Sequence, residues 1–259
     1  MTSWSRNTVT ASSCRSESMF DAVTFRLDHH NAILKALRAL DGDLLLEAKC
    51  YFGGGTAIAL ALDEYRESVD IDFLCADRDG YRTLRTLLAG QKDLSNILRA
   101  GADLASLREV KSDQYGIRTA LQCDNARIKF EIVRESRIDL TGEIDPRYGV
   151  PVLDRNCMFA EKLMANSDRW LDRSVMSRDI IDLSLMISRW GEIPKEAWGI
   201  AEDSYGEKAR EDYNKAIELI RTPEHMDVCA EKLRITNSVV EEVLAQYGGP
   251  YPRQLSPFD

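Results

Sequence analysis

The chain has 259 residues, a formal net charge of −9, a pI near 5.0, and 44% hydrophobic and 30% charged residues. This length is enough for one sizeable core or two lobes without disulfide bonds, and the composition excludes wholesale disorder. The acidic charge argues against a long basic track for duplex nucleic acid. It leaves room for a small-nucleotide site or for a local basic patch that binds RNA.

Six cysteines are scattered along the chain without a CxxC pair, which excludes zinc-ribbon and thioredoxin-like motifs on spacing. Scattered cysteines without a secretory signal are typical of the reducing cytoplasm, where we expect this protein. No apolar run approaches the roughly 20 residues that span a bilayer, so no membrane association is expected. Residues 1–18 are rich in Ser and Thr and are expected to form a flexible leader.

Hydrophobic periodicity predicts a mixed α/β arrangement in residues 19–150. A helix is expected from about Met19 to Leu40, ending at the turn Asp41-Gly42-Asp43. The next expected elements are a strand at Cys50–Phe52, a helix at Ala57–Leu62 with Thr56 as its N-cap, a strand at Val69–Leu74 and a helix at Tyr81–Leu88. Further strands are expected at Leu107–Val110, Ile117–Gln122, Ile128–Val133 and Val150–Leu153, with a hairpin loop at Cys123–Ala126.

Residues 151–247 predict an all-helical region. The clearest helices are Met158–Asn166 and Ser174–Trp190, and three or four more are expected between Pro194 and Tyr247. The last residues, 248–259, contain three prolines and predict an extended tail. The change from mixed α/β to all-helical sequence places a boundary near residues 145–155.

Three Asp-x-Asp pairs occur in the chain, but only Asp70 and Asp72 lie within an apolar strand. Asp41 and Asp43 flank a glycine and predict a turn, whereas the pair at positions 77 and 79 predicts a helix N-terminus. In a strand with a period of two, Asp70 and Asp72 lie on one face. Because like charges side by side repel, the pair favours a cation such as Mg²⁺, although an acidic solvent-facing strand explains the pattern equally well.

Gly53-Gly54-Gly55-Thr56 separates a predicted strand from a predicted helix. Glycines let the backbone approach a phosphate closely, and a helix N-terminus offers free N–H groups. The segment is neither a P-loop nor a dinucleotide fingerprint, because no Gly-Lys-Ser/Thr follows and Ile58 replaces the third glycine. By itself, the glycine segment is also compatible with a tight turn that only connects the strand to the helix.

Three further segments carry candidate functional residues. Glu131 lies on the predicted strand Ile128–Val133, and if that strand neighbours Asp70 and Asp72, three acids converge on a site that could hold two metal ions. Lys162 lies on the next predicted helix, and Asp179 and Asp182 lie on the helix after it. Lys129–Glu131 and Lys162–Asp179 ion pairs are the structural alternatives, and an Arg178–Asp182 pair at i, i+4 is compatible with the spacing.

Together, these motifs resemble the AbiEii/AbiGii-type toxin nucleotidyltransferases, which belong to the polymerase-beta-like nucleotidyltransferase superfamily. The resemblance covers roughly residues 45–190. It is carried by Gly53-Gly54-Gly55-Thr56, Arg66-x-Ser68-x-Asp70-Ile71-Asp72, Glu161-Lys162-Leu163 and Arg178-Asp179-x-x-Asp182-Leu183. It implies an α+β fold, in which a nucleotidyltransferase-like mixed sheet with flanking helices (19–150) precedes a helical bundle that completes the nucleotide cleft (151–247).

The resemblance also implies roles for single residues. The metal ligands would be Asp70, Asp72 and Glu131, holding Mg²⁺ or Mn²⁺. The alternative role for Glu131 is to take the proton of the acceptor hydroxyl. The nucleoside triphosphate would be bound by Gly54, Gly55, Thr56, Arg66, Ser68 and Lys162. Asp179 or Asp182 would order the nucleotide or the lysine. An acceptor hydroxyl would attack the α-phosphorus in line, and pyrophosphate would leave.

The implied function is that of a toxin with a neighbouring antitoxin as partner and transfer RNA or another RNA as acceptor. An RNA acceptor would need a basic patch, for which the candidates are Arg108, Lys111, Arg118 and Arg127. Two alternatives remain at the level of sequence: a metal-dependent glycosyltransferase with an Asp-x-Asp motif, and a catalytically silent relative that binds a nucleotide or a partner protein.

Overall fold

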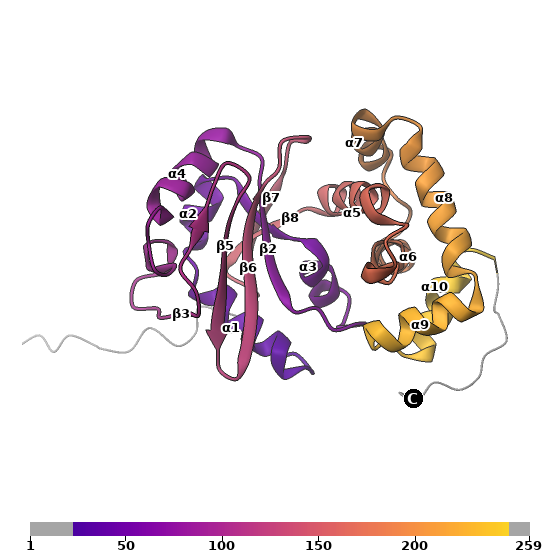
Figure 1. The fold of residues 1–259 in the computed structure, drawn as a ribbon, viewed down its shortest axis with the longest axis horizontal. Helices are drawn as coiled ribbons and strands as arrows, with labels where there is room; N and C mark the ends of the chain where they lie inside the picture. Colours follow the sequence, from indigo (N-terminus) through magenta and orange to yellow (C-terminus); the bar gives the residue numbers. More distant parts are fainter. Residues whose placement is uncertain (1–22, 249–259) are drawn as a thin grey trace, which may run out of the picture.

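The computed structural model describes residues 23–248. One mixed β-sheet carries helices on both sides, and helices alone make up the later part of the described chain (Figure 1). This arrangement confirms the predicted α+β class. No helix within residues 23–248 is both long and apolar enough to cross a membrane.

The sheet has eight strands in the order β3-β5-β6-β2-β1-β8-β7, and β4 also pairs with β5. The strands are β1 Cys50–Gly53, β2 Asp70–Cys75, β3 Ala105–Ser106, β4 Lys111–Ser112, β5 Gly116–Cys123, β6 Ala126–Arg134, β7 Gly142–Asp145 and β8 Val150–Leu153. Strand β2 is central, because it runs antiparallel to β1 and parallel to β6.

The α-helices in the first part of the described chain are α1 Asp28–Ala39, α2 Gly42–Glu47, α3 Gly54–Ala61 and α4 Arg78–Leu88. Those in the second part are α5 Arg155–Arg169, α6 Arg178–Trp190, α7 Lys195–Tyr205, α8 Lys208–Ile220, α9 Pro223–Leu233 and α10 Asn237–Ala245. Two short 3₁₀ helices lie at Ser95–Ile97 and Arg173–Val175. In Figure 1, α2 and α4 lie on one side of the sheet, and α3, α5 and α6 lie on the other.

Alternation along β2 determines which residues reach the core. Ile71 and Phe73 are fully buried on one face, whereas Asp70 and Asp72 lie on the opposite face, which is only partly covered. The ring of Phe73 packs against those of Phe52 and Phe130, with centroids 5.7 and 5.9 Å apart. The aromatic contacts hold three adjacent strands together, so the carboxylates stand on a rigid support.

Several helix boundaries differ from the predicted ones because side-chain carboxylates accept hydrogen bonds from backbone N–H groups at these positions. The first described helix begins at Asp28, not near Met19, which lies outside the described residues. The preceding backbone is extended, and the carboxylate of Glu64 accepts hydrogen bonds from the N–H groups of Arg26 and Leu27. The expected turn at Asp41 is the N-cap of α2, where its carboxylate accepts from two backbone N–H groups.

Two further predictions about secondary structure are wrong, and one strand has no predicted counterpart. Leu107–Val110 is not a strand, and the short strands β3 and β4 lie on either side of it instead. The expected helix at Ser174 begins only at Arg178, since Met176 and Ser177 have left-handed backbone conformations that interrupt it. Strand β7 was not predicted: it is four residues long and lies at the sheet edge, beside β8.

Candidate functional site

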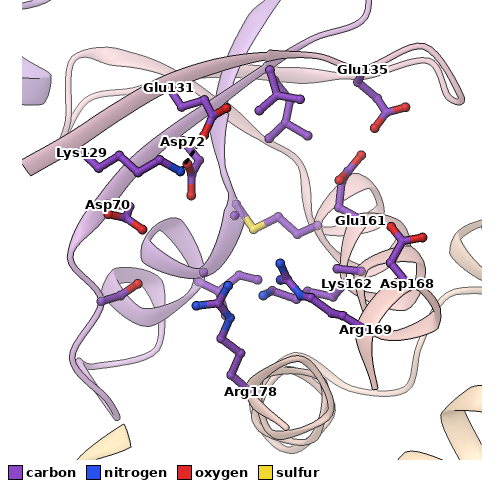
Figure 2. A pocket seen from close by; sticks show the side chains of 18 of the residues that line it. Asp70, Asp72, Lys129, Glu131, Glu135, Glu161, Lys162, Asp168, Arg169 and Arg178 are labelled. Atoms are coloured by element: carbon purple, nitrogen blue, oxygen red, sulfur yellow. Dashed lines mark ion pairs between the residues drawn. The ribbon is translucent and has the colours of Figure 1, made fainter. Parts of the chain in front are cut away.

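A cleft of about 340 Å³ lies between the partly covered face of the sheet and the helices α3, α5 and α6. Its walls come from β2, β6, the start of α3, one face of α5 and the start of α6. Figure 2 shows Asp70, Asp72 and Glu131 on the sheet side, with Lys162, Arg169 and Arg178 projecting from the helices. Sheet and helices thus bring acidic and basic groups to the same cavity.

Asp70 and Asp72 both line this cleft, as the strand alternation predicts. Burial raises the pKa of Asp72, and the negative charges of Asp70 and Glu131 raise it further against the opposing charge of Lys129. Crowded carboxylates of this kind are relieved by a cation, and two carboxylates are a common protein contribution to a Mg²⁺ site that phosphate oxygens complete. The donor set therefore fits such an ion.

The glycine turn brings the backbone close to these carboxylates. Gly54 has φ = +70°, and a Cβ at this position would lie 3.2 Å from Oδ2 of Asp72. A Cβ on Gly55 would lie 2.5 Å from Nη2 of Arg66. The N-cap of α3 is Gly53 rather than the predicted Thr56, so the helix begins at the cleft wall with its first N–H groups free of a side-chain cap.

The loop before β2 places Ser68 at the cleft. Its hydroxyl lies 2.8 Å from that of Thr56, which is buried and does not line the cleft, so the predicted contact of Thr56 with nucleotide is not supported. The backbone N–H of Ser68 lies 3.1 Å from Nε2 of the buried His30, and Nδ1 of that ring lies 2.8 Å from Glu64. Helix α1 thus fixes the position of Ser68.

A buried ionic network lies behind the cleft. Arg66 donates to Asp182 in a bidentate pair with distances of 2.8 and 2.9 Å, and the hydroxyl of Tyr65 donates to the same carboxylate. Lys162 lies 2.7 Å from Asp182 and 2.9 Å from Asp179. The network joins the loop before β2 to α5 and α6.

The two aspartates position cations rather than line the cleft. Asp179 and Asp182 are 3% and 0% exposed, and neither borders the cavity. Although burial opposes the shift, Lys162 and Arg169 lower the pKa of Asp179, and Arg66 and Lys162 lower that of Asp182. Both carboxylates therefore stay ionised. The anticipated Arg178–Asp182 pair is not formed, since Asp182 is bound to Arg66 and Lys162 instead.

Four cations, three of them on helices, lie along one wall of the cleft. Arg66, Lys162, Arg169 and Arg178 line this wall together with the acids Glu161 and Asp168, and the buried Asp179 and Asp182 lie behind them. No ion pair links Arg178 to any of residues 23–248. Cations grouped along one wall of a partly enclosed cavity favour a polyanionic ligand at that wall.

Glu131 lies beside Asp72 in the parallel register of β2 and β6. Its carboxylate is 2.5 Å from Nε of Arg118 and 2.6 Å from Nζ of Lys129. These hydrogen bonds lower the pKa of Glu131 against the effect of burial. Asp70, Asp72 and Glu131 line one cleft from neighbouring strands, as expected. Within residues 23–248, however, no three His, Cys, Asp or Glu side chains are grouped closely enough to hold a metal ion.

Several ionisable groups at the cleft were not predicted as site residues: Lys129, Glu135, Arg137, Glu161, Asp168, Arg169 and Arg178. Lys129 was noted only as an ion-pair partner. The face of α5 that borders the cleft contains Met158, Glu161, Lys162, Ala165, Asp168 and Arg169. Their spacing of three and four residues is that of one helix face, so extending the periodicity from Lys162 would have indicated Glu161 and Arg169.

Carboxylates on a strand thus face helix-borne cations across one cleft, on a mixed sheet flanked by helices. The family model for the nucleotidyl transferase AbiEii toxin of type IV toxin–antitoxin systems matches residues 35–244. The chain therefore belongs to the AbiEii nucleotidyltransferase toxin family. Family membership sets aside the glycosyltransferase alternative.

Solved structures with distant similarity include JHP933 from Helicobacter pylori, with 16% identity, 86% of this chain and 96% of that chain covered, and a TM-score of 0.42. The nucleotidyltransferase toxin MenT4 from Mycobacterium tuberculosis shares 16% identity over 85% of this chain and 94% of that chain, with a TM-score of 0.36. An antigenic nucleotidyltransferase-like protein from Paracoccidioides brasiliensis shares 15% identity over 74% and 93%, with a TM-score of 0.40. No curated protein matches the chain.

Proposed function

We propose that this toxin-family nucleotidyltransferase moves a nucleoside monophosphate from a nucleoside triphosphate to a hydroxyl of an RNA, with Mg²⁺ or Mn²⁺ held by Asp70 and Asp72. One observation carries the proposal. The carboxylates of β2 and the cations of α5 and α6 border the same cleft beside the glycine turn at the start of α3. That combination suits a triphosphate better than a neutral ligand.

When bound, the cation would neutralise charge on the phosphates and favour departure of pyrophosphate. Asp70 and Asp72 would hold it, and Gly54 leaves space at Oδ2 of Asp72 that a side chain would fill. Glu131 is assigned a different role. Its ion pairs with Arg118 and Lys129 orient those two side chains at the edge of the site.

The chain's own residues bind and align the triphosphate. Lys162 and Arg169 are held in place by Asp179, so they need little reorganisation to meet phosphate oxygens. Arg178 is free to contact the phosphates directly. The acceptor oxygen then bonds to the α-phosphorus as the bond from that phosphorus to the bridging oxygen breaks. Pyrophosphate leaves, and the hydroxyl proton passes to solvent.

A row of side chains across the sheet supports an RNA acceptor. Asp72 pairs in register with Glu131, Glu131 with Arg118, and Arg118 with Lys111 at the edge of the sheet. Arg127 lies on the same face of β6 as Glu131, because an even number of residues separates them. These cations offer contacts to a phosphate backbone that leads to the carboxylates. Arg108 is not part of a strand, and its carbonyl accepts from Thr119.

Family membership in a toxin–antitoxin system also supports a partner protein that restrains the activity. We propose that the chain is the toxin of such a pair. Co-expression of the neighbouring gene with this chain should restore growth that this chain alone inhibits.

The transfer activity is tested by incubating the protein with each α-labelled nucleoside triphosphate, Mg²⁺ and total RNA. We expect label in the RNA, and no label with the Asp70→Asn/Asp72→Asn double variant. The Lys111→Ala/Arg127→Ala double variant should weaken RNA labelling while nucleotide binding stays unchanged. Label on the protein itself would indicate that the acceptor is the protein and not an RNA. Nucleotide binding without any transfer would indicate a catalytically silent relative.

A further inference from the structure

The end of the cleft that lies away from Asp70 and Asp72 has a different character. Along the open face of the sheet, the carboxylate-bearing positions are followed by Leu74 on β2 and Val133 on β6, and then by Glu135. Helix α5 adds Met158 to this lining, and Figure 2 shows Glu161 of α5 next to Glu135. The cavity therefore passes from a charged end to an apolar middle that ends at two acids.

The dimensions fit a nucleoside. Four residues separate Glu131 from Glu135, which corresponds to about 13 Å along an extended strand. A ribose and base attached to a phosphate at Asp70 and Asp72 would span a similar length. The apolar side chains of Leu74, Val133 and Met158 would then flank the flat faces of the base, while its polar edge would meet the acids.

Glu161 is the polar group at this end that still has hydrogen-bonding capacity. Glu135 is held by Arg137, which donates to both of its oxygens, and by the N–H of Ser136, which donates to one. The Oε1 atom of Glu161 is buried and has no hydrogen-bond partner among residues 23–248. In Figure 2, the Glu161 carboxyl group extends between Glu135 and the cleft.

One proton is shared between the two acids. Burial raises the pKa of Glu161 to about 8, and the negative charge of Glu135 and a hydrogen bond with it add to the shift against the charge of Arg137. Glu161 is therefore a neutral carboxyl group at pH 7 and donates its proton to Glu135. Its second oxygen is then a hydrogen-bond acceptor without a donor among residues 23–248, on a side chain that lines the cleft.

We propose that Glu161 determines which nucleobase is accepted by taking a hydrogen bond from an exocyclic amino group, so that amino-bearing bases are preferred to their oxo counterparts. The inference rests on the proposed function, since it assigns the base end of the same nucleotide site. Cytosine and adenine present such an amino group, whereas uracil and hypoxanthine present a carbonyl oxygen at the same ring position. A carbonyl oxygen facing the acceptor oxygen of Glu161 would leave both without a donor, which is unfavourable in a partly buried site.

The test compares two matched nucleotide pairs, CTP with UTP and ATP with ITP, by calorimetric titration of the full chain in Mg²⁺. Each amino-bearing nucleotide should bind at least about fivefold more tightly than its oxo partner. Glu161→Leu should abolish this preference while the phosphate-binding residues keep some affinity for all four. Glu161→Gln should retain the preference, because its amide N–H₂ can donate to Glu135 and its carbonyl oxygen can face the cleft. Glu241→Gln, an exposed change on α10, is the matched control.

Equal binding within both pairs by the unmodified protein would overturn the inference while leaving the proposed function intact. So would a preference that persists in Glu161→Leu. If none of the four nucleotides binds, the inference fails; if GTP does not bind either, the proposed function fails with it. Should Glu161→Leu not fold, the comparison within each pair on the unmodified protein and on Glu161→Gln still decides.

Discussion

Asp72 combines features that are costly for folding and useful for binding a cation. Burial and the neighbouring charges of Asp70 and Glu131 raise its pKa, so the ionised form is disfavoured without a positive partner. We predict that Asp72→Asn lowers transfer at least about 100-fold while it leaves stability unchanged or raises it by about 1 kcal/mol. Labelled-nucleotide transfer and thermal unfolding measure the two effects. Activity within tenfold of the unmodified protein would remove Asp72 from the reaction.

Gly54 and Gly90 form a matched pair for separating backbone strain from crowding at the site. Both have φ near +70°, but a Cβ at Gly54 meets Asp72, whereas one at Gly90 meets nothing within 4 Å. We predict that Gly90→Ala costs about 1 kcal/mol from the left-handed conformation alone and leaves activity intact. Gly54→Ala should lower the free energy of unfolding by at least as much, and it should also reduce nucleotide transfer. Equal activity of the two variants would show that the close approach to Asp72 is not needed.

Glu131 differs from Asp72 because Arg118 and Lys129 already neutralise its charge. We predict that Glu131→Gln reduces transfer less than tenfold, in contrast to Asp72→Asn. Titration with Mg²⁺ provides a second measurement, since the concentration for half-maximal activity should hardly change. A large rise in the Mg²⁺ concentration for half-maximal activity would instead indicate that Glu131 is a metal ligand.

At the level of elements, periodicity in the sequence predicts much of this fold. The alternation in β2 correctly places Asp70 and Asp72 on one face, and the Ile128–Val133 pattern identifies the core of β6. The apolar stripe of α6 identifies that helix but not its start. Its first residue depends on the left-handed backbone at Met176 and Ser177, which no hydrophobic pattern records.

The partners of charged residues could not be predicted in the same way, because they depend on contacts between distant segments. Arg66 and Asp182 are separated by 116 positions and form a buried bidentate pair. Glu131 meets Arg118 only through the register of the β5–β6 hairpin. Local spacing suggested an Arg178–Asp182 pair instead, and tertiary packing overrides it.

Asp182 and Arg178 lie on the same helix and permit a direct comparison of stability with binding. Asp182→Ala would leave the buried guanidinium of Arg66 without its carboxylate, and we predict a loss of about 3–5 kcal/mol in the free energy of unfolding. Arg178→Ala removes a cation that borders the cleft, so it should weaken nucleotide binding with less than about 1 kcal/mol of destabilisation. Denaturant unfolding and nucleotide titration of both variants test this. Similar destabilisation by the two changes would contradict the assigned roles.

Across the whole molecule, the net charge of −9 hides a concentration of cations at one place. Arg66, Lys162, Arg169 and Arg178 all border one cleft, on the wall opposite the carboxylates of β2, and low-dielectric surroundings strengthen their field on a ligand. The acidic remainder of the surface would repel RNA generally. Binding of a polyanion is therefore restricted to the cleft and to the row of cations that leads from it to the edge of the sheet.

Opposing titrations set the pH dependence of stability. The lowered pKa values of Asp179 and Asp182 mean that stability is lost as pH falls below their ordinary value of 3.8. Glu161 acts in the opposite direction, since its pKa is raised from 4.5 to about 8. Between pH 4.5 and about pH 8, Glu161 keeps its proton in the folded state but has released it in the unfolded state. The free energy of unfolding therefore falls as the pH rises through this range.

The variant Glu161→Gln isolates this contribution, because the amide has no proton to lose. We predict that it matches the unmodified protein near pH 4.5 and becomes the more stable of the two by on the order of 3 kcal/mol at pH 8. Chemical unfolding at a series of pH values gives the difference curve. Subtracting one protein from the other cancels His225, whose pKa burial and the charge of Arg173 lower in both. If the difference in free energy of unfolding stays constant from pH 4.5 to 8, Glu161 is ionised in the folded protein. That result would contradict a protonated Glu161 that donates to Glu135.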